Sequence, residues 1–271
     1  MYTSEETLSV IAETGYKKAH KTLPEKLILG FMGGMFISLG YLLDIRVIAS
    51  ISDWGSFANF IGAALFPVGL ICILLAGGEL ITSNMMAVAV AFFDKKIKLN
   101  RLLNNWFWIT LANLIGAVFV AYVFGHVAGL TEAEPYLSKT IHTAEAKVGD
   151  SFLVAFISGI GCNIFVAVAA WLNFTAKSFT GKVLGIWFPV MAFVAIGFQH
   201  VVANMFIIPA AIFAGHLTWF DFLMNVIPVF LGNAVGGAIF IGLAYYLAFK
   251  KYHSAPASKK NHLALDKKRA G

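Results

Sequence analysis

Long hydrophobic runs, separated by short polar stretches, make up most of this 271-residue sequence. A helix needs about 20 residues to cross the hydrocarbon core of a bilayer, and six of the runs reach that length. The pattern therefore predicts an all-α membrane protein with six transmembrane helices. The runs cover residues 27–49, 57–93, 106–129, 151–173, 183–214 and 222–249.

The second and fifth runs are too long for one plain span, and they resemble each other in sequence. Both contain Phe-Pro-Val followed by Asn-Met, and the run after each contains a matching segment around an asparagine. Asn84 and Asn113 are 29 residues apart, as are Asn204 and Asn233. Three matches in the same order indicate an internal duplication. The matched segments are 66–68, 84–85 and 111–116 in the first half and 188–190, 204–205 and 231–236 in the second.

Each half of this repeat holds three spans, an odd number, so the two halves are expected to be inverted relative to each other in the membrane. Inverted repeats with broken helices are typical of transporters and channels, because unwound backbone at membrane depth survives only beside protein or a cavity. The second and fifth helices are predicted to break near residues 77–84 and 197–200. We expect the two breaks to face each other at the midplane and to form a binding site.

The two ends of the chain differ from the spans. Residues 1–26 carry glutamates and no apolar signal-peptide core, and their apolar residues recur at helical spacing. This predicts an amphipathic helix lying on the membrane surface, ahead of a six-span domain over residues 27–249. Residues 250–271 form a basic tail that we expect in water near anionic lipid.

Composition and charge support a membrane protein. Hydrophobic residues make up 59% and charged residues only 13%, which excludes a disordered chain and disfavours a soluble enzyme. Seventeen lysines and arginines fall on one side of the predicted membrane and three on the other. The excess places both termini in the cytoplasm, in a cell membrane of bacterial type, and the net charge of +6 needs no nucleic-acid partner. Cys72 and Cys162 lie in apolar runs and predict neither a disulfide nor a metal site.

His200 is the ionisable residue that stands out. It lies deep in the fifth run without a charged neighbour, where such a group is costly and usually functional; the alternative is a neutral histidine locked by one backbone hydrogen bond. Thr82, in the break of the first half, either binds this histidine or a solute, or closes its own loop. Glu79 is expected to cap free backbone N–H groups at its break.

Each of several other residues near the breaks has two possible roles, one functional and one structural. Lys147 either draws anions toward a pore or is a solvated loop lysine. Phe66, Leu70 and Phe193 either pack in the core or form a constriction that resists hydrated ions. Three asparagines either satisfy unwound backbone or line a pore: Asn163, Asn204 and Asn233. Six glycines allow close helix contacts: Gly30, Gly33, Gly34, Gly236, Gly237 and Gly242.

Three segments, Gly77–Asn84, Gly197–Met205 and Gly232–Gly237, together resemble the formate/nitrite transporter family. The likeness extends from the N-terminal helix to the sixth span. It implies an aquaporin-like protomer in a homopentamer, with one pore per protomer for small monovalent anions: formate, nitrite or hydrosulfide. We expect no cofactor, no metal and no enzymatic activity.

The same resemblance implies roles for individual positions. His200 is the central pore histidine, Thr82 its loop partner, and Lys147 the lysine that draws anions. Gln199 departs from the family, which usually has glutamate there; because a carboxylate would stabilise an imidazolium, the pH range of His200 is expected to differ. The remaining implied positions are pore asparagines Asn163 and Asn233, one constriction of Phe66, Leu70 and Phe193, and a second of Leu80, Ile81 and Val166.

These residues suggest a transport hypothesis. A bare anion in an apolar constriction is costly, whereas an anion neutralised by a proton is not. Lys147 attracts the anion, which meets His200 between the constrictions and passes as the neutral acid or as a hydrogen-bonded pair. Whether the protein is a channel or a proton-coupled carrier stays open at this stage.

Several other functions remain as alternatives. Residues 143–148 resemble the formate-type members of this family more than the others, and this likeness favours formate, while nitrite and hydrosulfide remain open. An aquaglyceroporin-like channel for neutral solutes would share the architecture, but the paired Asn-Pro-Ala signature of such channels does not occur in the sequence. An intramembrane enzyme has thin support, because His200 has no paired nucleophile or metal ligands. Polar residues at both breaks argue against a purely structural protein.

Overall fold

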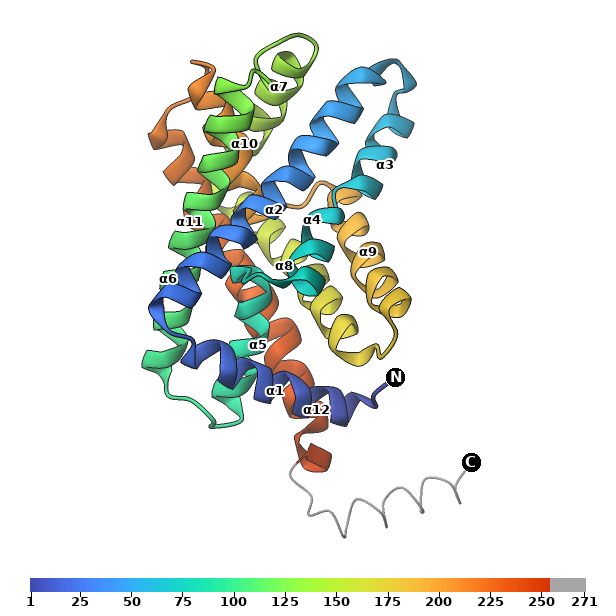
Figure 1. Ribbon diagram of the computed structural model, residues 1–271, viewed down its shortest axis with the longest axis vertical. Helices are drawn as coiled ribbons and strands as arrows, with labels where there is room; N and C mark the ends of the chain where they lie inside the picture. The colour runs from blue at the N-terminus through green and yellow to red at the C-terminus, as the bar shows by residue number, and fades with distance from the viewer. Residues whose placement is uncertain (254–271) are drawn as a thin grey trace.

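The structure is a computed structural model that describes residues 1–253, and these residues fold into one bundle of helices (Figure 1). Most of the helices run along the long axis of the bundle, while α1 lies across one end of it. The elements are α1 Ser4–His20, α2 Leu23–Ser50, η1 Ser52–Trp54, α3 Ser56–Leu65, α4 Val68–Ile71, η2 Cys72–Gly77, α5 Ile81–Phe93, α6 Leu99–Phe119, η3 Val120–Val127, α7 Tyr136–Val148, α8 Phe152–Thr175, α9 Phe179–Ile196, α10 Val201–Phe213, α11 Trp219–Ala234, η4 Val235–Leu243 and α12 Ala244–His253.

Six helical segments among the described residues are long and apolar enough to cross a membrane, which confirms the predicted number. The second and fifth runs are each divided: a crossing segment is followed by a shorter apolar helix, α5 or α10. Figure 1 shows α1 and α5 toward one end of the bundle and α7 and α10 toward the other. The six crossing segments are Leu23–Ser50, Ser56–Gly77, Leu99–Val127, Phe152–Thr175, Phe179–Ile196 and Trp219–Lys251.

The two helix breaks occur where the sequence predicted them. Gly77 has φ +113° and Gly197 has φ +91°, a region that favours glycine because it has no Cβ. The first break is narrower than predicted, since α5 already begins at Ile81. Thr82 and Asn84 therefore lie in the first turn of a helix, and our placement of Thr82 in a loop was wrong.

One helix was missed by the sequence reading. Residues 136–148 form α7, where we expected a loop that carries Lys147. This helix is too polar to appear as a hydrophobic run, but Leu137, Ile141, Ala144 and Val148 follow the spacing of one helical face. Lys147 is thus held in the last turn of an ordered helix.

The N-terminal helix packs on protein along its apolar face. Leu8 and Ile11 of α1 are fully buried and cluster with Met86 and Ala87 of α5. A Cβ on Gly15 would collide with the backbone of Ala87, so the two helices are in close contact. The surface helix that we expected is therefore docked on the bundle by the same face that was predicted to meet lipid.

The predicted basic tail is only partly described. Its first residues continue α12 as far as His253. Residues 254–271, with the cluster of lysines and Arg269 near the end of the chain, lie outside the described residues.

Glycines set the closest helix contacts, at one helix crossing in each half of the chain. A Cβ on Gly34 of α2 would collide with the backbone of α6 at Asn113, and one on Gly116 of α6 would collide with the backbone of α2. In the second half, a Cβ on Gly232 of α11 would collide with the backbone of α8, and one on Gly159 of α8 would come within 2.8 Å of the α11 backbone. Small residues at these crossings let the helix backbones touch.

We predict that Gly116→Ala and Gly232→Ala each destabilise the protein, by about 1–3 kcal/mol, because the added methyl group meets backbone that has no room to move. The measurement is the thermal unfolding midpoint of the purified protein in detergent. Gly149→Ala is the matched control, since Gly149 has a helical φ of −71° and an exposed position. Equal midpoints for all three variants would contradict the prediction.

Candidate functional site

His200 and Thr82 meet inside the bundle, one from each half of the chain. Thr82 Oγ1 lies 2.9 Å from His200 Nε2, and both side chains are buried. The backbone N–H of Ala203 donates to His200 Nδ1 over 3.1 Å. Because an amide N–H can only donate, Nδ1 carries no proton, and the neutral ring has its single N–H at Nε2. The histidine is therefore a donor that points at the threonine hydroxyl.

Two helix N-termini converge on this pair. Thr82 lies in the first turn of α5, and His200 is the N-cap residue of α10. The N-terminus of a helix carries partial positive charge and free N–H groups. The arrangement favours a negative solute between the two helices and disfavours a positive charge on the His200 ring.

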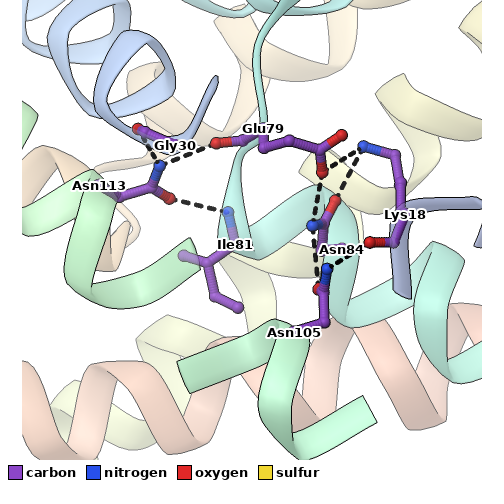
Figure 2. A network of polar contacts seen from close by, with 7 residues as sticks. All are labelled: Lys18, Gly30, Glu79, Ile81, Asn84, Asn105 and Asn113. Carbon is purple, nitrogen blue, oxygen red and sulfur yellow. Dashed lines mark hydrogen bonds and ion pairs between the residues drawn. The ribbon is translucent and has the colours of Figure 1, made fainter. Parts of the chain in front are cut away.

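Asn113 on α6 closes the first break (Figure 2). Its Oδ1 accepts a hydrogen bond of 2.9 Å from the N–H of Ile81. Its Nδ2 donates to the carbonyl oxygens of Gly30, at 2.7 Å, and Glu79, at 2.8 Å. One side chain thus satisfies two backbone groups at the break, the Ile81 N–H and the Glu79 carbonyl, and ties them to the Gly30 carbonyl of helix α2.

Asn233 on α11 makes the same three contacts at the second break. Its Oδ1 accepts from the N–H of Val201 at 2.9 Å, and its Nδ2 donates to the carbonyl oxygens of Gly159, at 2.8 Å, and Gln199, at 3.1 Å. The two halves of the predicted duplication therefore share the same set of hydrogen bonds at their breaks. The inverted orientation of the halves in a membrane stays a prediction.

A second polar network joins Glu79 to the N-terminal helix (Figure 2). Lys18 Nζ donates to Glu79 Oε2 at 2.8 Å and to Asn84 Oδ1 at 3.0 Å. Asn84 Nδ2 donates to Glu79 Oε2 and to Asn105 Oδ1, and Asn105 Nδ2 donates to the Lys18 carbonyl oxygen. The Lys18 and Glu79 side chains are only 12% and 4% exposed, so this ion pair is buried.

Our expectation that Glu79 caps backbone N–H groups was wrong. Its carboxylate binds the Lys18 ammonium and the Asn84 amide instead, while Asn113 serves the N–H of Ile81. The physical reason is the docked helix α1: a buried carboxylate is best compensated by a full opposite charge, and Lys18 supplies it.

The second half repeats this network with an amide in place of the carboxylate. Asn204 Nδ2 donates to Gln199 Oε1 and to Asn225 Oδ1, each at 2.7 Å. Asn225 Nδ2 donates to the Lys147 carbonyl oxygen at 2.7 Å. Gln199 Nε2 donates to Asp150 Oδ2 at 2.6 Å. The Gln199 side chain is thus engaged in this network.

The two lysines differ in their charge partners. Lys18 forms an ion pair with Glu79, but Lys147 forms none within the described residues. Lys147 Nζ donates instead to the Gly197 carbonyl oxygen at 3.1 Å. Asn204 Oδ1 is the counterpart of the atom that Lys18 binds in the first half, and it has no hydrogen-bond partner within residues 1–253. The Lys147 ammonium therefore has no direct ion-pair partner among the described residues, and Asp150 acts on it only from a distance.

The expected first constriction is a group of buried rings next to His200. The ring centroids of Phe66 and Phe193 are 5.9 Å apart, and the Phe193 ring stacks on His200 at the same distance. Tyr41 extends the row, with its ring 5.5 Å from Phe66. Leu70 is 1% exposed and belongs to the same apolar cluster.

The expected second constriction is equally apolar. Leu80, Ile81 and Val166 are all buried, and all three belong to the cluster that holds Phe66 and Phe193. Asn163 lies nearby and donates to the carbonyl oxygens of Thr82 and Asn233, at 3.2 and 2.6 Å. Its Oδ1 is buried without a partner.

A pocket of about 410 Å³ leads to this site from the end where α7 lies. Its wall includes Lys147 and His200, together with the rings of Phe66 and Phe193. The pocket thus connects this lysine to the central histidine. The other lining residues are Tyr41, Asp44, Ile48, Asn59, Lys139, His142, Thr143, Ala146, Asp150, Val194, Ala195, Gly197, Phe198, Ala203 and Asn204.

Sequence reasoning missed several of these polar residues. Asn105 and Asn225 follow Asn84 and Asn204 by the same 21 residues, a signal that the repeat offered. Lys18 gave no such signal, because only the docking of α1 brings it to Glu79. Asp44 was also missed; it lies near the end of the first hydrophobic run, two residues before Arg46.

Comparisons with known proteins agree with this geometry. A model described as formate/nitrite transporter matches residues 5–247. The uncharacterized transporter YrhG of Bacillus subtilis is 58% identical over 257 residues, which are 94% of this chain and 96% of that protein. The formate channel BtFdhC of Bacillus thuringiensis is 55% identical over 251 residues, or 92% and 96% of the two chains.

Solved structures give the same result. A structure described as an FNT family ion channel has a TM-score of 0.84 at 27% identity and covers 90% of this chain and 98% of its own. A pentameric formate channel with formate bound has a TM-score of 0.74 at 29% identity, over 84% and 97% of the two chains.

We predict that Lys18→Met destabilises the protein by about 3–5 kcal/mol, because it leaves the Glu79 carboxylate buried without a partner. Adding Glu79→Gln to this variant should restore most of the loss, since the second half uses Gln199 at the same place without an ion pair. The measurement is the free energy of unfolding in mixed detergent. Lys17→Met, on an exposed neighbouring residue, is the control. No rescue by the second substitution would contradict the prediction.

Proposed function

Because the chain belongs to the formate/nitrite transporter family, we propose that it is a membrane channel for small monovalent anions, with formate as its main substrate. Nitrite and hydrosulfide share the single charge and small size of formate and are the other candidates. The observation that carries the proposal is His200: a neutral N–H donor, enclosed by apolar rings, where the N-termini of two helices meet.

The orientation and assembly form part of this proposal. The side with seventeen lysines and arginines faces the cytoplasm, so the pocket lined by Lys147 opens to the outside; we call it the outer vestibule. The assembly is a homopentamer, supported by the likeness to a pentameric formate channel. Each protomer contains one complete site and so conducts alone.

Lys147 acts at the entrance. Its ammonium attracts an anion from the outside into the vestibule, where low-dielectric walls strengthen the attraction. The partial burial of Lys147 lowers the pKa of its ammonium. The attraction is therefore lost at a lower pH than for an exposed lysine as the pH rises.

His200 and Thr82 act at the centre. A substrate carboxyl group that reaches them accepts the Nε2–H of His200 and the Thr82 hydroxyl, and the N-termini of α5 and α10 stabilise negative charge on its oxygens. Beyond this point Leu80, Ile81 and Val166 offer no polar group. Passage through this apolar ring requires the anion to be neutralised, either by a proton or within a hydrogen-bonded pair.

We predict that His200→Asn reduces formate uptake into proteoliposomes about 100-fold, because a positioned donor is lost from an apolar site. Thr82→Ser, which keeps the hydroxyl, should retain most of the uptake. Radiolabelled formate uptake measures both. Unchanged formate uptake in His200→Asn would remove the central role of the histidine, and glycerol flux without any anion flux would overturn the proposed substrate class.

We also predict that Lys147→Gln raises the formate concentration for half-maximal uptake about tenfold, with a smaller effect of added salt, because the steering charge is gone. Lys147→Arg keeps the charge and should resemble the wild type. At alkaline pH the half-maximal formate concentration of the wild type should rise toward that of Lys147→Gln. That of Lys147→Arg should stay low, because arginine keeps its charge. A wild-type advantage that is independent of salt and pH would contradict this role.

A further inference from the structure

Asp44 is a buried carboxyl group that no step described so far uses. It lies on α2 one helical turn beyond Tyr41, in the wall of the outer vestibule. The residue is only 5% exposed. Its Oδ1 has no hydrogen-bond partner among the described residues.

The surroundings of Asp44 hold charge at a distance but no direct partner. A Cβ on Gly62 would collide with Asp44 Oδ1, so the carboxyl group packs directly on α3, which offers it no donor there. None of the ion pairs among the described residues involves Asp44. The titratable groups that line the same vestibule are Tyr41, Lys139, His142, Lys147, Asp150 and His200.

A carboxylate buried without a donor is costly, and the usual outcome is that the group binds a proton. The resulting carboxylic acid has an O–H donor that it lacked before. Asp44 is thus suited to hold a proton in the vestibule, at a place where an incoming anion passes.

His200 does not supply such a proton in this structure. Its Nδ1 already accepts from Ala203, so its only proton is the one at Nε2. A neutral imidazole that gave this proton away would become an imidazolate, which is a far stronger base than any carboxylate. Where a proton neutralises the anion, its source is therefore water or a group other than His200.

We propose that Asp44 is the proton-binding residue of the outer vestibule, and that an entering small carboxylate takes its proton from the Asp44 carboxyl group. This inference rests on the proposed function. It adds the source of the proton and a second contact for the substrate, ahead of His200.

The step balances as a simple proton transfer. The O–H bond of Asp44 breaks and its electron pair stays on the Asp44 oxygen, while a new O–H bond forms on the substrate. The substrate continues as the neutral acid, and Asp44 recovers a proton from outside water. A buried Asp44 holds its proton more strongly than a carboxylic acid in water does. The transfer becomes feasible when the entering carboxylate also leaves water, because desolvation raises the proton affinity of that anion in the same way. Lys139 and Lys147, in the same wall, stabilise the charge left on Asp44 meanwhile.

The test compares wild type, Asp44→Asn and Asp53→Asn in proteoliposomes that contain a pH-sensitive dye. Formate uptake and proton uptake are recorded together at several external pH values, with empty liposomes subtracted. Asp53→Asn is the matched control, because Asp53 is an exposed acid a short distance along the chain from α2 that does not line the vestibule.

We expect Asp44→Asn to lower coupled uptake about 100-fold at neutral pH, the range for loss of a positioned acid. At strongly acidic pH the variant and the wild type should take up formate at similar rates, because formic acid is then already present in the bulk solution. Asp53→Asn should match the wild type throughout. A purely structural role for Asp44 would lower uptake equally at every pH, and that result would overturn the proposal.

Infrared spectra of the purified protein give a second measurement that needs no transport. The wild type should show the C=O band of a buried carboxylic acid at neutral pH, and Asp44→Asn should lack it. Absence of that band from the wild type would overturn the proposal. If the wild type carries no formate, the proposed function fails; if it carries formate and Asp44→Asn does so equally with the same proton uptake, only the role of Asp44 fails.

Discussion

The structure depends on one constraint, that backbone polar groups inside a membrane need partners. Each of the two broken helices exposes N–H and C=O groups at a depth where water does not reach them. Asn113 and Asn233 each satisfy two such groups, and each also binds one carbonyl oxygen of an intact helix, at Gly30 and Gly159. Because these side chains hold the unwound segments, α5 and α10 can begin in the interior, and Thr82 can meet His200. The central site is a consequence of how the breaks are closed.

The two halves of the repeat differ in the charge of their polar networks. In the first half a carboxylate and an ammonium are buried together, which keeps that network close to neutral. In the second half Gln199 takes the place of Glu79 and binds Asp150, while the Lys147 ammonium remains at the wall of the vestibule. The two copies of the network, one with a buried ion pair and one built on an amide, therefore differ in their electrostatics.

Much of the fold could be predicted from the sequence, because hydrophobic runs and the spacing of asparagines reflect physical requirements of a bilayer. The six spans, both breaks and the pairing of the two asparagine sets follow from that pattern. Helix α7 and the contact between Lys18 and Glu79 did not follow, since both depend on how amphipathic segments dock on the bundle. The unpaired state of Asp44 was equally hidden, because it results from the packing of α3 at Gly62.

The attachment of the two lysine-bearing helices uses main-chain atoms. Asn105 binds the carbonyl oxygen of Lys18, and Asn225 binds that of Lys147. A carbonyl oxygen is present whatever the side chain, so the amino acid at position 147 can change without loss of this anchor. Substitutions at position 147 can therefore change which anions the entrance attracts, by shape or charge density, while the attachment of helix α7 stays the same.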